Sequence, residues 1–181
     1  MKYYDFLVVG SGIAGLSFAL KAARHGSVGV LTKRKSGDSN TAWAQGGIAC
    51  VTGDDDTFDS HVADTLDAGA GLCDEEAVRT IVSEGPERIQ ELIDLGVAFD
   101  REDDGDLCLG MEGGHSKRRI LHHKDTTGKA ISDALITAAR EEPAIDLVED
   151  HYAVDLVTTS KLGQPTNERC VGLYALNQKT G

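Results

Sequence analysis

Phe6-Leu7-Val8-Val9-Gly10-Ser11-Gly12-Ile13-Ala14-Gly15 is the stretch that decides the fold of this chain. Its four leading residues are all apolar, which predicts a strand over residues 4–9 that is buried on both faces of a parallel sheet. Residues 16–25 carry apolar side chains at helical spacing, and residues 28–31 form a second apolar run. A strand, a glycine turn, a helix and a second strand make one βαβ unit. The sequence therefore predicts an α/β chain whose Rossmann-like domain is built on a parallel sheet.

The remaining elements are expected to be shorter or less regular. We expect helices over residues 57–68 and 129–140, and a helix capped by Asp74 that stops at Gly85-Pro86 before a new helix begins. Residues 100–123 are expected to be irregular. Strands are expected over residues 145–148, 153–158 and 171–176, and a small antiparallel β-meander should accompany the parallel sheet.

The three glycines of the first turn have the spacing Gly-x-Gly-x-x-Gly, at positions 10, 12 and 15. The first glycine permits a tight turn, the second lets the pyrophosphate of a ligand approach the backbone, and the third lets helix and strand pack closely. The free N–H groups at the start of the helix then favour an anion. This motif predicts a dinucleotide site.

The end of the second strand leaves the identity of the dinucleotide open. An acidic residue usually stands there to bind the ribose hydroxyls, but the sequence continues Thr32-Lys33-Arg34. These basic residues would suit the 2′-phosphate of NADP, or an adenosine that is held by backbone groups and Lys33. The loop over residues 39–48 favours FAD, because Gly46-Gly47 lets backbone amides approach a ring system and the polar side chains of the loop offer donors.

Composition and spacing argue against several other classes. Eighteen Lys and Arg against thirty Asp and Glu leave a net charge of −12, which disfavours a nucleic-acid partner. The chain shows no signal peptide and no apolar run long enough for a membrane span, so we expect a cytoplasmic protein. His115, His122, His123 and Asp125 do not have a recognised metal-ligand spacing, and no metal site is expected.

A charged segment over residues 112–125 is a further candidate site. It contains four Lys or Arg residues and three of the six histidines of the chain. Glycines beside a carboxylate and several cations favour an anion-binding site over a plain solvated loop. Residues 125–130, which begin at the end of this segment, do not form a Walker A loop, because the first glycine of that motif is missing and Ala130 replaces Ser or Thr.

The motifs together resemble the succinate dehydrogenase and fumarate reductase flavoprotein family, and within it the L-aspartate oxidase branch. The resemblance is collinear and rests on residues 10–15, 40–49, 59–61, 68–74, 112–116 and 119–122. It implies an enzyme that oxidises L-aspartate to iminoaspartate, the first step of de novo NAD biosynthesis. It also implies that oxygen or fumarate re-oxidises the flavin and that quinolinate synthase consumes the product.

The resemblance also implies the roles of individual residues. FAD is expected to be bound without a covalent link, because Asn40 stands where the dehydrogenase relatives carry the histidine that attaches to the flavin. Glu112 is expected to orient the substrate. The residues expected to contact FAD are Gly10, Ser11, Gly12, Ile13, Ala14, Gly15, Lys33, Asn40, Thr41, Ala42, Trp43, Ala44, Gln45, Gly46, Gly47, Tyr152 and Ala153.

Members of this family are longer than this chain, which therefore resembles the N-terminal part of the FAD-binding domain, incomplete at its C-terminus. The capping domain, the C-terminal helical domain and the catalytic residues are expected to lie outside residues 1–181, so the isolated chain should be inactive. Two alternatives stay open. One is a fumarate reductase or succinate dehydrogenase flavoprotein subunit, against which Asn40 and Glu112 argue, and the other is a nucleotide-binding module without catalysis.

Overall fold

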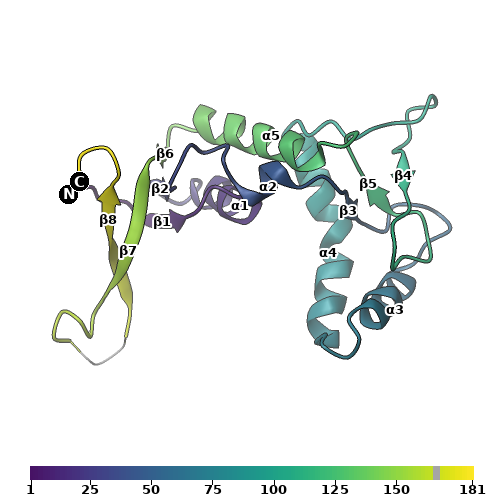
Figure 1. Cartoon of the computed structure of the whole chain (residues 1–181), viewed down its shortest axis with the longest axis horizontal. Coiled ribbons are helices and arrows are strands. Elements are labelled where there is room, and N and C mark those ends of the chain that lie inside the picture. Colours follow the sequence, from purple (N-terminus) through teal and green to yellow (C-terminus); the bar gives the residue numbers. More distant parts are fainter. Residues whose placement is uncertain (165–167) are drawn as a thin grey trace. The chain divides into compact units, whose positions relative to one another are not determined.

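The predicted βαβ unit is present in the computed structural model, which describes residues 1–164 and 168–181. Strand β1 (Phe6–Val9) leads through the glycine turn into helix α1 (Ile13–Ala22), and strand β2 (Val28–Leu31) follows. The chain separates into two units, which are described one at a time. The first unit comprises Met1–Ala42 and Ser132–Gly181, and the second comprises Trp43–Ile131. Figure 1 labels the elements of both units.

The first unit is built on a parallel sheet in the order β1-β2-β6. Strand β6 (Ile145–Val148) pairs with β2 along its whole length, so that all four residues of the central strand are buried. Within residues 1–181, β1 is the outer strand of this sheet and Leu7 and Val9 are exposed, so the burial expected on both faces of β1 is not seen in this part of the protein. Residues 132–141 of helix α5 (Thr127–Glu141) belong to this unit and include the buried side chains of Leu135, Ile136 and Ala139.

An antiparallel hairpin completes the first unit. Strands β7 (His151–Thr158) and β8 (Cys170–Asn177) pair with each other and include the predicted strands 153–158 and 171–176. The expected antiparallel meander is thus a hairpin of two strands, since residues 145–148 join the parallel sheet instead.

The second unit contains two helices and a small antiparallel sheet. Helix α3 (Phe58–Ala68) is capped by Thr57, and the short helix α2 (Asn40–Trp43) ends where the unit begins. The sheet has the order β3-β5-β4, with β3 (Ile48–Ala49), β5 (Ile120–Leu121) and β4 (Leu109–Gly110). The prediction that residues 100–123 are irregular is therefore wrong at β4 and β5. Ile120 and Leu121 are buried, and their burial fixes the pairing.

Helix α4 (Glu75–Asp94) corrects a second expectation, because it continues through Pro86. Asp74 caps it as predicted, with its carboxylate accepting the Ala77 N–H at 2.9 Å. A proline inside a helix removes one backbone hydrogen bond and costs about 3 kcal/mol. Buried Val82 and Ile89 stand on either side of Pro86, two helical turns apart, and their common packing face keeps the helix continuous. No helix within residues 1–164 and 168–181 is both long and apolar enough to cross a membrane.

Candidate functional site

Two positions in the glycine turn of the first unit, 10 and 15, require glycine. Gly10 has φ +105°, in the region that side chains disfavour. A Cβ on Gly15 would lie 2.1 Å from the carbonyl oxygen of Gly10, so a side chain there would push helix α1 away from the turn. Gly12 is the N-cap of α1, and because glycine has no side chain it makes no capping hydrogen bond to the first N–H groups of the helix. The start of this helix therefore presents backbone N–H groups and a positive dipole end to an anion.

The loop after β2 returns to this turn. The Ile13 N–H donates to Thr41 Oγ1 at 3.0 Å, and a Cβ on Gly12 would lie 3.4 Å from the same hydroxyl oxygen. The sequence predicts both segments as parts of one dinucleotide site, and the structure brings them together within the first unit.

A cavity of about 510 Å³ opens at this point of the first unit. Among its lining residues are eight of the predicted FAD contacts: Gly10, Ser11, Gly12, Lys33, Asn40, Thr41, Tyr152 and Ala153. Sequence reasoning missed Val9, Leu31 and His151, which also line the cavity. For two of them the signal is position, because Val9 and Leu31 end neighbouring parallel strands and ligands of open α/β sheets bind at the carboxyl ends of strands. His151 begins β7 and carries no such signal.

A buried polar network lies beneath the cavity and was also missed. The Ser11 hydroxyl donates to the Ser36 carbonyl oxygen at 2.9 Å, and the Ser36 N–H and hydroxyl both donate to Glu149 Oε1 at 2.8 Å. The hydrogen bond from the Ser36 backbone and the ammonium group of Lys35 lower the pKa of Glu149 to about 2. An ionised carboxylate from the end of β6 thus fixes the loop where the acidic ribose ligand usually stands.

The second unit has its own cavity, of about 350 Å³, around Glu112. It brings Glu112 together with Gln45, Gly46 and Gly47, all predicted site residues. A Cβ on Gly46 would lie 3.5 Å from Glu112 Oε1, and a Cβ on Gly47 would lie 2.4 Å from the Leu121 carbonyl oxygen. The glycine pair therefore packs against β5 in a way that no side chain permits, and it leaves room for the Glu112 carboxylate.

Arg119 fixes the segment that carries Glu112. Its side chain is fully buried, and it donates to both carboxylate oxygens of Asp56 at 2.7 Å and to Asp64 at 2.7 Å. Asp64 also accepts the N–H and the hydroxyl of Ser116 at 2.8 and 2.9 Å. Burial acts to raise the pKa of Asp56, but the hydrogen bonds from Arg119 and Thr57 outweigh it and hold this pKa below its ordinary value.

Fewer cations of residues 112–125 face a possible anion than the sequence predicts, because two of them pair with carboxylates of the chain. Arg119 is turned inward onto two carboxylates, and Lys117 pairs with Asp55 at 3.1 Å. Both cations thus have acidic partners within the chain, whereas Lys124 lines the cavity with Glu112.

Six predicted contacts line neither cavity. They are Ile13, Ala14, Gly15, Ala42, Trp43 and Ala44. The first three belong to helix α1 and follow the turn directly. Trp43 is 76% exposed, and the Ala44 carbonyl oxygen accepts the Gly128 N–H at 3.1 Å.

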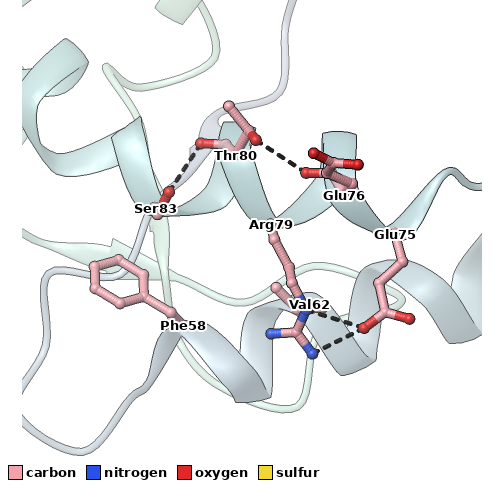
Figure 2. Close-up of a pocket in the computed structure, with 7 residues that line it drawn as sticks. All are labelled: Phe58, Val62, Glu75, Glu76, Arg79, Thr80 and Ser83. Carbon is pink, nitrogen blue, oxygen red and sulfur yellow. Dashed lines mark hydrogen bonds and ion pairs between the residues drawn. The ribbon is translucent and has the colours of Figure 1, made fainter.

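A hollow of about 610 Å³ between α3 and α4 contains no predicted site residue. Figure 2 shows that its polar side chains bond to each other or to the helix backbone. Arg79 donates to Glu75 at 2.9 Å, Thr80 donates to the Glu76 carbonyl oxygen, and Ser83 donates to that of Thr80. The hollow therefore lacks polar groups that converge on a common ligand position.

Comparisons with known proteins show the family to which the chain belongs. The model of the family described as "FAD binding domain" matches residues 5–181. The L-aspartate oxidase of Arabidopsis thaliana chloroplasts is 49% identical over 179 residues, which cover 99% of this chain and 27% of the relative. The L-aspartate oxidase of Pseudomonas aeruginosa is 48% identical over 185 residues, with 98% and 34% covered. The chain thus spans about a third or less of the length of these relatives.

Solved structures share the fold. A mutant FrdA chain of E. coli quinol fumarate reductase superposes with a TM-score of 0.86 at 29% identity, over 96% of this chain and 29% of that chain. The open conformation of a flavocytochrome c3 fumarate reductase gives a TM-score of 0.83 at 25% identity, over 98% and 31%. The α/β fold with a parallel sheet and antiparallel sheets is therefore that of the FAD-binding domain in these flavoproteins.

Proposed function

Because this chain belongs to the FAD binding domain family, we propose that it is the cofactor-binding part of an FAD-dependent L-aspartate oxidase. FAD is the cofactor of the family, and when bound it supplies the acceptor for the hydride that leaves the α-carbon of the amino acid. The relatives are named L-aspartate oxidases, and the proposal assigns the same activity to the whole protein to which this chain belongs. Residues 1–181 then form the N-terminal part of the FAD-binding domain, and the capping and helical domains belong to other parts of the protein.

The first-unit cavity would hold the pyrophosphate and the adenosine of FAD. Backbone N–H groups of the turn and of the α1 N-terminus would bind the phosphate oxygens, and Gly10 and Gly15 would keep the space that this approach needs. Lys33, Tyr152 and Ala153 line the same cavity and would contact the adenosine side. Asn40 also lines it, and an amide cannot act as the nucleophile for a covalent flavin link.

The observation that carries the substrate assignment is the position of Glu112 over the Gly46-Gly47 turn. Aspartate and succinate share two carboxylates and differ by one ammonium group. A carboxylate in the cavity attracts that ammonium and repels a bare dicarboxylate, so Glu112 would select the amino acid. The Arg119 network holds the Glu112 segment in place, which keeps the carboxylate at its position beside the glycines.

The experiment that tests this proposal uses the full-length protein, purified with its flavin. Addition of L-aspartate should produce hydrogen peroxide in air and should bleach the flavin absorbance without oxygen. Fumarate should restore the absorbance. Succinate, which lacks the ammonium, should act much more slowly, and faster bleaching by succinate than by aspartate would contradict the proposal.

A flavoprotein subunit of fumarate reductase is the second candidate, because the fold similarity to such chains is high. The chain is 29% identical to that FrdA chain and 49% identical to the L-aspartate oxidase of Arabidopsis thaliana. This difference and the presence of Glu112 favour the oxidase. The bleaching experiment separates the two by the preferred reductant. The consumption of iminoaspartate by quinolinate synthase in NAD biosynthesis and the cytoplasmic location remain predictions from the sequence.

A further inference from the structure

We infer that His122, held in place by Asp100, binds a carboxylate group of the substrate in the cavity that contains Glu112. This inference rests on the proposed function and adds a second recognition group to the same site. His122 follows β5 directly and lines the second-unit cavity together with Glu112 and the glycine pair. The side chain is 29% exposed, so it is accessible from the cavity without being free in solvent.

Asp100 fixes the orientation of the imidazole ring. His122 Nδ1 lies 3.0 Å from Asp100 Oδ2, and the same carboxylate oxygen accepts the Lys124 N–H at 2.7 Å. The hydrogen bond from Lys124 and the contact with His122 hold the pKa of Asp100 below its ordinary value. Because an ionised carboxylate can only accept, Nδ1 carries a hydrogen and donates it to Asp100, whichever state Nε2 is in.

The other nitrogen of the ring is left for a ligand. Within residues 1–164 and 168–181, no hydrogen bond reaches His122 Nε2. The neighbouring ring atom, Cδ2, would lie 3.4 Å from a Cβ on Gly110, which also lines the cavity. His122 and Gly110 thus form part of the same cavity wall, with Nδ1 held by Asp100.

The charges around the ring suit a zwitterionic dicarboxylate. Asp100, Glu112 and Asp125 are the acidic groups near the imidazole, and His123 and Lys124 are the basic ones. If Glu112 takes the ammonium of the amino acid, the carboxylates need donors on other parts of the wall. A protonated His122 offers Nε2–H for a charge-assisted hydrogen bond, and Asp100 balances the positive charge of the ring.

The decisive test measures the binding of succinate, which has both carboxylates and no ammonium, to the full-length FAD-loaded protein by calorimetry. We expect His122→Phe to raise the Kd of succinate at least about tenfold, the loss of one hydrogen bond to a charged group. Glu112→Gln should leave this Kd unchanged or lower it. The exposed histidine His25 provides the matched control, and His25→Phe should have no effect.

A glutamine at position 122 separates recognition from folding. His122→Gln retains an N–H donor in a side chain of similar reach, so succinate binding should be weaker than in the wild type but stronger than in His122→Phe. The KM for aspartate in His122→Phe should rise by the same factor as the Kd of succinate, while kcat changes less.

Two results would overturn the inference. One is an unchanged Kd of succinate in His122→Phe. The other is a flavin spectrum or FAD content altered by His122→Gln, which would place the ring against the cofactor. A wild type that binds succinate but does not oxidise aspartate would contradict the proposed function instead, and the succinate measurements on His122 would still stand.

Discussion

Replacing Arg119 by methionine would leave two carboxylates of the second unit without their common partner. Asp56 is fully buried at its side chain and Asp64 is 17% exposed, and both lie 2.7 Å from the guanidinium group. Removing one partner of a buried ion pair costs about 3–5 kcal/mol, because the remaining charge stays desolvated. We expect urea unfolding of the full-length protein at pH 7 to show a loss of this size. The control is Lys117→Met, whose pair with Asp55 is exposed and should contribute less than about 1 kcal/mol.

The stability difference between the wild type and Arg119→Met should also change with pH in a defined direction. In the wild type the pKa values of Asp56 and Asp64 are lowered, so their contribution to stability is complete above their unfolded values of 3.8 and is lost as the pH falls through the lower folded values. In Arg119→Met, burial without the guanidinium raises the pKa of Asp56, and its protonation relieves the uncompensated charge. The stability difference between the two proteins should therefore shrink between pH 7 and pH 4. A constant or growing difference over this range, or a loss below about 1 kcal/mol at pH 7, would refute the reasoning.

Three further predictions concern the cofactor and the chain itself. Gly15→Ala should abolish FAD retention, measured as the ratio of flavin to protein absorbance, because its Cβ would lie 2.1 Å from the Gly10 carbonyl oxygen, whereas Gly113→Ala, whose Cβ meets no atom within 4 Å, should retain FAD. Acid precipitation of the full-length protein should leave the flavin in the supernatant, and yellow colour in the pellet would contradict the role of Asn40. Residues 1–181 expressed alone should show no aspartate-dependent peroxide, since they span 27–34% of the oxidase relatives, and turnover by this chain would mean that the site is misplaced.

The parts of the fold that the sequence predicts best are those that local patterns specify. The βαβ unit follows from two apolar runs and three glycines, and the Asp74 cap follows from a carboxylate before a helical stripe. The continuation of α4 through Pro86 could not be predicted locally, because it depends on tertiary packing of Val82 and Ile89. Strands β4 and β5 are two residues long and lie among charged residues, so no alternation reveals them.

The residues of the candidate site likewise fall into those that the sequence indicates and those that only the structure reveals. Gly10 and Gly12 of the glycine motif line the first-unit cavity, and Glu112, which the family resemblance singles out, lines the second-unit cavity, while their contacts with a ligand stay predictions. Glu149 and Asp100 could not be found, because each acts through partners that lie 113 and 22 positions away. Long-range partners of this kind carry no local signal. A carboxylate directly after a parallel strand, as in Glu149, is the one feature that points to such a role in retrospect.

The most direct test of the central claim is the substrate preference of Glu112→Gln in the full-length protein. If the Glu112 carboxylate binds the ammonium of L-aspartate, kcat/KM for aspartate oxidation should fall about tenfold or more, the effect of losing a hydrogen bond to a charged group. Fumarate reduction should be retained, because fumarate has no ammonium. Unchanged aspartate kinetics, or equal losses on aspartate and fumarate, would contradict the account.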